Sequence, residues 1–89
     1  MLTPQPDNKF KKDVLLCQAQ GLKMDKLKDI IQLLTDEKPL PVKCRNHKLS
    51  GNWSGWWECH VAPDWILIYR VAGEELQLAR TGTHAKLFG

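Results

Sequence analysis

The chain has 89 residues, of which 43% are hydrophobic and 26% are charged, and its formal net charge is +3. This length and composition are typical of one small globular domain, covering residues 1–89, and exclude both a large multidomain protein and a charged, disordered chain. No apolar run approaches the roughly 18 residues that span a bilayer, so we expect no membrane segment. The mild basic character suits a polyanionic partner without demanding one.

The chain has three cysteines, Cys17, Cys44 and Cys59. The first residues lack the basic and apolar regions of a secretory signal peptide, and an odd number of cysteines cannot all pair within one chain. We therefore expect free thiols in a reduced, cytoplasmic protein.

The first element expected is a short strand within residues 1–7. Two prolines there lack the backbone N–H, so we expect an edge strand at most. A helix follows from Asn8, with Asp7 or Asn8 as its N-cap, and Gly21 ends it. Its apolar positions at three-to-four spacing are Phe10, Val14, Leu16 and Cys17.

A second helix is predicted from Met24 to Thr35, where apolar residues recur at helical spacing. They are Met24, Leu27, Ile30, Ile31 and Leu34. Asp25 lies in the first turn, where a negative charge favours the helix dipole, and prolines at positions 39 and 41 prevent continuation. Two short helices of this kind need another layer to pack against.

Three strands are predicted after the helices, at residues 56–62, 65–71 and 75–81, joined by short turns. The central strand is almost continuously apolar, as expected of a strand with neighbours on both sides. We predict an α+β fold of the order β-α-α-β-β-β, with an antiparallel sheet of three to four strands and both helices packed on one face. Alternation along the first of these strands places Cys59 toward the helices, and Glu58 and His60 on an open face.

One feature of the last strand departs from simple alternation. Leu76, Leu78 and Arg80 share a face if the strand is regular, yet a leucine belongs in the core and an arginine does not. Either a β-bulge intervenes, or Arg80 lies beyond the regular end of the strand.

Residues 47–69 hold two of the three histidines, all four tryptophans, and an aspartate directly after a proline. Imidazole titrates near neutral pH and indole can stack on a base, so these residue types suit proton transfer on a nucleic acid. RNA can be cut without a metal when its own 2′-OH attacks the adjacent phosphorus. Two titratable groups and a permanent cation suffice for that reaction, and the histidines, Asp64 and Arg80 supply them.

A metal site is the alternative interpretation of the same segment, because Cys44 and His47, or Cys59 and His60, superficially resemble zinc ligands. Adjacent residues of a strand point to opposite faces, so Cys59 and His60 cannot easily bind one ion. No second pair with ligand spacing is present. We therefore expect neither a metal nor a cofactor.

Three segments resemble the YafQ-type toxins of the RelE/ParE superfamily of toxin-antitoxin systems. They read HKL at 47–49 followed by Gly51, ECHVAPDWILIY at 58–69, and RTGTH at 80–84 followed by Leu87-Phe88. The resemblance extends from residue 10 to the end of the chain, and the motif His-x3-Asp-Trp with Arg-Thr-Gly-Thr-His about 20 residues later is specific. The sequence departs at Trp57, where many relatives carry an arginine, and in the prolines of the first strand.

The resemblance implies a RelE-like fold and a ribosome-dependent, metal-independent mRNA endoribonuclease. The catalytic residues implied are His47, His60, Asp64, Arg80 and His84. We expect Arg80 to hold the phosphate, His84 and Asp64 to form the acid-base pair, and His47 and His60 to orient groups or activate the nucleophile. The residues expected to contact RNA are Arg45, Lys48, Trp65 and Phe88. By pattern alone, Trp65 is at least as well explained as a core residue, and Asp64 as a turn residue.

The resemblance also implies partners. They are a cognate antitoxin, in a heterocomplex expected to be a heterotetramer, and mRNA in the decoding site of the 30S subunit, with operator DNA bound through the antitoxin. A non-enzymatic ParE-like toxin that binds DNA gyrase is the main alternative, although such binders lack this set of titratable groups. A small basic RNA-binding module without chemistry is a third hypothesis.

Overall fold

A five-stranded sheet in the order β1-β5-β4-β3-β2 forms the centre of the computed structural model, which describes residues 1–88. As predicted, β3 (Trp57–Ala62), β4 (Trp65–Ala72) and β5 (Glu75–Gly82) form an antiparallel meander. The edges are two short strands. β1 (Thr3–Pro6) pairs in parallel with β5, and β2 (His47–Lys48) pairs antiparallel with β3.

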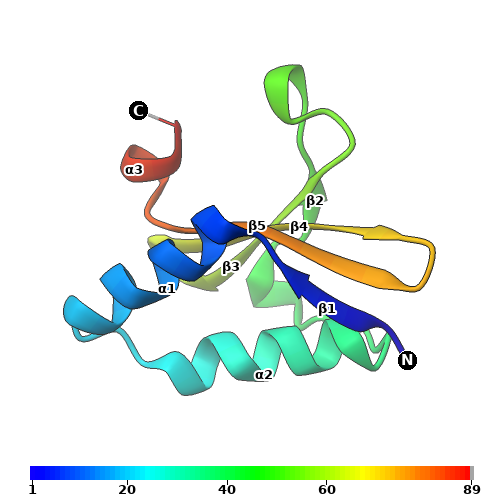
Figure 1. Cartoon of the computed structure of the whole chain (residues 1–89), viewed down its shortest axis with the longest axis horizontal. Helices are drawn as coiled ribbons and strands as arrows, with labels where there is room; N and C mark the ends of the chain where they lie inside the picture. The colour runs from blue at the N-terminus through cyan, green and yellow to red at the C-terminus, as the bar shows by residue number, and fades with distance from the viewer. Residues whose placement is uncertain (89) are drawn as a thin grey trace.

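Two helices, α1 (Asn8–Ala19) and α2 (Met24–Thr35), cover one face of this sheet (Figure 1). The N-cap of α1 is Asp7, whose side chain accepts a hydrogen bond from the backbone N–H of Lys9. Gly21 follows the helix at φ +80°, where a residue with a Cβ would be strained. The bounds of both helices and the N-cap of α1 agree with the sequence prediction. Within residues 1–88, none of the helices has the length and apolar character needed to cross a membrane.

The main hydrophobic core lies between these helices and the sheet. Cys59, Leu67 and Leu76 are fully buried in it, one from each strand of the meander. The helices contribute Phe10, Cys17, Leu27 and Ile30. Burial of this apolar layer is the main source of stability that a domain of this size has available.

The opposite sheet face is partly covered, which corrects the prediction of an open face. Ile66, Ile68 and Ala79 are buried there beneath side chains from the segment between β2 and β3 and from α3 (His84–Phe88). The covering residues are Leu49, Trp53, Trp56 and Leu87. The 3-10 helix η2 (Gly51–Trp53) lies in that segment, and both it and α3 rise from the side of the sheet away from α1 and α2 (Figure 1).

A β-bulge in β5 resolves the alternation of its side chains. Ile68 pairs with Arg80, whereas the next residue of β4, Tyr69, pairs with Leu78, so Ala79 is the extra residue. Leu78 therefore packs in the helix-side core, while Arg80 lies opposite Ile68. The bulge alternative is confirmed.

Strand β2 was not predicted, because two residues in a polar context show no alternation. Its pairing decides where His47 lies, since His47 is opposite Glu58 and Lys48 is opposite Trp57. The 3-10 helix η1 (Val42–Cys44) precedes it and ends at Arg45, which has a left-handed backbone at φ +48°.

Candidate active site

Glu58 lies at the centre of a group of polar side chains on the sheet face away from α1 and α2. Its carboxylate is almost buried, with 5% of the side chain exposed. One oxygen, Oε2, is 2.9 Å from Nε2 of His47, and the other, Oε1, is 3.2 Å from Nε2 of His84. Strand pairing supplies the first contact and the start of α3 supplies the second. A single carboxylate thus holds two histidines that are 37 positions apart in the sequence.

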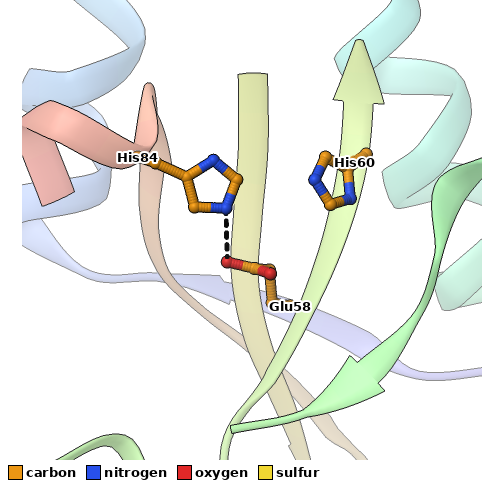
Figure 2. Close-up of side chains that lie close together, drawn as sticks. All are labelled: Glu58, His60 and His84. Atoms are coloured by element: carbon orange, nitrogen blue, oxygen red, sulfur yellow. Dashed lines mark ion pairs between the residues drawn. The ribbon is translucent and has the colours of Figure 1, made fainter. Parts of the chain in front are cut away.

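His60 completes the group from the same strand as Glu58. Figure 2 shows the rings of His60 and His84 near the Glu58 carboxylate, and their centroids are 5.4 Å apart. Nδ1 of His60 is buried, and among residues 1–88 it has no hydrogen-bond partner. The ring of Phe88, one turn along α3, lies 6.0 Å from that of His84. Most buried side-chain polar atoms have a hydrogen-bond partner, so this nitrogen is an exception.

Asp64 lies in the turn between β3 and β4. Its Oδ1 is 3.9 Å from Nδ1 of His84, and 75% of its side chain is exposed. The two ring nitrogens of His84 therefore face two different carboxylates, Glu58 at the inner side and Asp64 at the solvent side. The predicted acid-base pair is brought together, at a distance that a substrate group or a water molecule can bridge.

Each ring nitrogen of His47 lies close to an oxygen atom of another residue. Its Nδ1 is 2.7 Å from the carbonyl oxygen of Arg45, and a carbonyl can only accept, so Nδ1 carries the proton of that bond. Its Nε2 faces the Glu58 carboxylate, which also only accepts when ionised. Both ring nitrogens of His47 thus face oxygen atoms, and the two contacts fix the orientation of the ring. The left-handed backbone of Arg45 lies directly beside this carbonyl.

Arg80 is held by Asp13 of α1. Nε and Nη2 of Arg80 donate to the two oxygens of Asp13 at 2.7 and 3.1 Å, and the backbone N–H of Thr81 donates to the same carboxylate. These hydrogen bonds raise the pKa of Arg80, so the guanidinium stays cationic. Arginine has five N–H donors, and three remain after these two bonds. Among residues 1–88, the side chain of Arg80 makes its polar contacts with Asp13 and not with the histidines.

Glu58, His60 and His84 are also arranged as a metal site would require. One donor atom from each lies within 4.8 Å of the others, close enough to converge on one ion. The sequence did not predict this group. The cysteine and histidine pairs weighed from the sequence do not form such a site, because Cys44 and Cys59 are buried in the helix-side core.

Trp65 is a correction to the predicted site. Its side chain is 3% exposed in the helix-side core, and its Nε1 donates to Oγ1 of Thr81 at 2.8 Å. A ring with no exposed face cannot stack on a base. Of the other residues expected to contact RNA, Arg45, Lys48 and Phe88 are exposed. Nζ of Lys48 lies 5.6 Å from the centroid of the Trp57 ring.

Two residues of the site, Glu58 and Asp13, were missed at the sequence level. Glu58 carried a signal, since it alternates with His60 on the same face of a predicted strand. Asp13 lies between Phe10 and Cys17, which α1 buries, and a carboxylate inside an apolar stripe implies a buried partner. Neither signal says which residue the partner is.

Comparison with known proteins defines the class and the family. The family described as "Bacterial toxin of type II toxin-antitoxin system, YafQ" matches residues 2–89. The mRNA interferase toxin YafQ of Escherichia coli K12 is 47% identical over 81 residues, which cover 90% of this chain and 88% of that protein. The protein is therefore a bacterial toxin of the type II toxin-antitoxin class. Within this class, the chain belongs to the YafQ family, as the sequence motifs indicated.

Two solved structures resemble the whole chain. The toxin in the crystal structure of the E. coli DinJ-YafQ toxin-antitoxin complex has a TM-score of 0.90 and 43% identity, covering 99% of this chain and 98% of that one. A metal-bound toxin from Helicobacter pylori has a TM-score of 0.93 and 34% identity, covering 99% of this chain and all of that one. The α+β, RelE-like fold expected from the sequence is confirmed. The predicted antiparallel sheet of three to four strands is corrected to a mixed sheet of five, because β2 adds an edge strand and β1 pairs in parallel with β5. The expectation of an endoribonuclease agrees with the name of the E. coli relative.

Proposed function

We propose that this chain is the toxin of a toxin-antitoxin pair and cuts mRNA in the decoding site of the 30S subunit during translation. The observation that carries the proposal is the buried Glu58 carboxylate with His47 and His84 on its two oxygens and His60 beside them. The E. coli relative named mRNA interferase toxin supports the choice of substrate. The proposed place of action is the cytoplasm, where ribosomes translate.

The proposed reaction is attack of a 2′-OH on the neighbouring phosphorus. A base removes the 2′-OH proton, the new O–P bond forms as the bond to the 5′ oxygen breaks, and an acid protonates that leaving oxygen. The products are a 2′,3′-cyclic phosphate and a 5′-OH end, and no oxidant or metal enters the balance. His84 and Asp64 are the proposed acid-base pair, and His47 and His60 orient the RNA or activate its 2′-OH.

Glu58 acts on this reaction as a positioning residue. Its two oxygens fix the ring planes of His47 and His84, because each oxygen lies beside Nε2 of one ring. Because the carboxylate is almost buried, its interaction with a charged ring is screened less than it would be in water. The Glu58 side chain is only 5% exposed, so it has little surface with which to contact RNA.

Arg80 is the proposed phosphate clamp. Asp13 fixes the guanidinium by two hydrogen bonds and leaves three N–H donors for the oxygens of the cleaved phosphate. Holding the cation in place before the RNA arrives lowers the cost of ordering it in the transition state. Phe88 is 45% exposed and its ring lies 6.0 Å from that of His84. It is the proposed contact for a base, together with Arg45 and Lys48.

An antitoxin is the proposed protein partner. The E. coli relative was solved in complex with the antitoxin DinJ. We propose an equivalent heterocomplex for this chain, a heterotetramer through antitoxin dimerisation, with operator DNA bound mainly by the antitoxin. An acidic antitoxin segment near the cationic side chains would block RNA by charge as well as by bulk.

A metal ion is proposed as an inhibitor rather than a cofactor. Zn²⁺ and Cu²⁺ favour imidazole nitrogen, so Glu58, His60 and His84 fit such an ion. Binding would occupy His84, which the proposed reaction needs. We expect a chelator to leave cleavage unchanged, and Zn²⁺ binding measured by calorimetry to be lost in His60→Ala. Loss of cleavage on chelation would contradict the metal-independent reaction.

Primer extension on a messenger after brief induction tests the proposed function. We expect discrete cuts with the wild type, and a loss of about 10²- to 10⁴-fold in His84→Ala, because each acid or base contributes that much. Arg80→Ala should lose cutting as well. Arrested growth without cuts in all three proteins would favour a gyrase-binding toxin, which a supercoiling assay checks. Unchanged cutting in His84→Ala would leave an RNA-binding protein without this chemistry.

A further inference from the structure

A hollow of about 390 Å³ opens beside the active site and is lined almost entirely by basic and apolar residues. We call it the basic hollow. Its lining is Lys26, Lys43, Arg45, His60, Val61, Ala62 and Pro63. It lies where the first turn of α2, the 3-10 helix η1 and the end of β3 meet. Three positively charged side chains, Lys26, Lys43 and Arg45, thus line one concavity although they come from separate segments of the chain.

No carboxylate balances these cations within the described part of the chain. Lys26, Lys43 and Arg45 take part in none of the ion pairs formed by residues 1–88, and no acidic residue lines the basic hollow. Asp25 and Asp29, which neighbour Lys26 on α2, are exposed outside it. Like charges around a concavity with protein walls repel one another and concentrate a positive potential, which an anion relieves.

Arg80 provides a contrast within the same molecule. Its guanidinium has a carboxylate partner, Asp13, at 2.7 Å. The cations of the basic hollow have none among residues 1–88, so all of their donors are available to an external acceptor. Arg45 adds a strained, left-handed backbone at the rim, at φ +48°. Glycine or asparagine would adopt this conformation at lower cost. The backbone conformation at position 45 therefore does not favour arginine.

His60 connects the basic hollow to the active site. It lines the hollow and its ring lies 5.4 Å from that of His84. An RNA strand whose cleaved phosphate lies at His84 would reach the hollow by passing His60. This continuity favours a nucleic acid strand over an acidic peptide as the occupant, although both are anionic.

We propose that the basic hollow binds a phosphodiester group of the messenger strand adjacent to the cleaved one, on the His60 side of the active site. The proposal rests on the proposed function, because it takes RNA as the substrate. The proposal adds Lys26 and Lys43 to the residues that contact RNA. It also assigns Arg45, already expected to contact RNA, to a phosphate group. The contact reads no base, so it contributes affinity and position rather than sequence preference.

The test compares two triple variants of equal charge. Lys26→Gln, Lys43→Gln and Arg45→Asn together remove the cations of the basic hollow, with asparagine chosen because it tolerates a left-handed backbone. Lys11→Gln, Lys12→Gln and Lys28→Gln together remove three exposed cations from α1 and α2 that do not line it. The probe is a labelled, single-stranded 12-nucleotide RNA that is fully 2′-O-methylated and cannot be cut. Its affinity is measured by fluorescence anisotropy from 25 to 400 mM salt.

We expect the RNA affinity of the control variant, and its dependence on salt, to stay closer to the wild-type values than those of the hollow variant. For each phosphate that the hollow variant no longer binds, the slope of log K against log salt should fall by about 0.7, which is about fivefold in affinity at 0.1 M salt relative to 1 M. Equal affinities and slopes in the two variants would overturn the proposal, as would a wild type without salt-dependent affinity for the probe.

Two further measurements separate the other outcomes. If the hollow variant loses affinity for a hexaglutamate peptide but matches the control variant on RNA, the hollow is a peptide site and the proposal is wrong. Cleavage of translated messenger by the wild type is assayed in parallel. If that cleavage is absent while the hollow variant still loses RNA affinity, the proposed function fails and the basic hollow stands as an RNA site.

Discussion

The two faces of strand β3 differ in what they do. Cys59 points toward α1 and α2 and is fully buried, whereas Glu58 and His60, its neighbours in sequence, lie on the opposite face among polar groups. The helix-side face is a continuous apolar layer that stabilises the fold. The opposite face holds titratable side chains that interact with one another. Substitutions on the two faces should therefore separate stability from cleavage.

The largest expected effect on stability comes from the helix-side face. Leu67→Ala should lower the free energy of unfolding by about 2–5 kcal/mol, because Leu67 is fully buried and a cavity remains. Leu15→Ala, at a residue of α1 that is 66% exposed, is the control and should change it by less than about 0.5 kcal/mol. Urea unfolding measures both. Cleavage per folded molecule should stay near the wild-type value, and a drop of tenfold or more would break the separation of the faces.

A second effect on stability is expected only at alkaline pH, and it also comes from the helix-side face. Burial, with the neighbouring Cys44 and Glu58 adding to it, raises the pKa of Cys59 to about 12. Burial and the nearby thiols of Cys59 and Cys44 raise the pKa of Tyr69 to about 12 as well. The folded protein keeps these protons above the pH at which the unfolded chain releases them. Their contribution is therefore complete below about pH 9 and is lost as the pH rises toward 12.

Urea unfolding between pH 7 and 11.5 checks this dependence. The stability of the wild type should fall steeply above about pH 9, and Tyr69→Phe should flatten the fall by on the order of 1.4 kcal/mol per pH unit of the shift it removes. Parallel curves for the wild type and Tyr69→Phe would show that this phenol does not titrate abnormally.

The smallest expected effect concerns Trp65, the residue whose expected role the structure corrects. Trp65→Phe keeps an aromatic ring in the core and removes the hydrogen bond to Thr81. We expect a loss of about 1–2 kcal/mol in unfolding free energy and cleavage within about twofold of the wild type. A tenfold loss of cleavage with the fold intact would mean that Trp65 acts on the RNA, and its assignment to the core alone would be wrong.

Much of the fold could be predicted because its local signals agree with one another. The α2 stripe gave the bounds of that helix, and Asp7 and Gly21 marked the ends of α1. Strand β2 and helix α3 could not be predicted, since each is short and is held by tertiary contacts rather than by its own pattern. The cover over the second sheet face comes from α3 and from the segment between β2 and β3, and it was not predicted either.

The histidines of the candidate site were named from the sequence, but their contacts were not. His47, His60 and His84 were named from the family motif, and the structure brings all three to Glu58 or to one another. The central carboxylate was missed because a glutamate in a strand is usually solvated, and only the pairing of β2 with β3 reveals its partners. Likewise, the partner of Arg80 is 67 positions away on α1.

The central claim is that these side chains activate the 2′-OH of the messenger itself. The most direct test programs a ribosome with a messenger that carries a single 2′-deoxynucleotide at the cut position, beside an all-RNA control. The account predicts rapid cutting of the control by the wild type, with a 2′,3′-cyclic phosphate end, and no cutting at the deoxy position. Cutting at the deoxy position would mean that water is the nucleophile and would contradict the account.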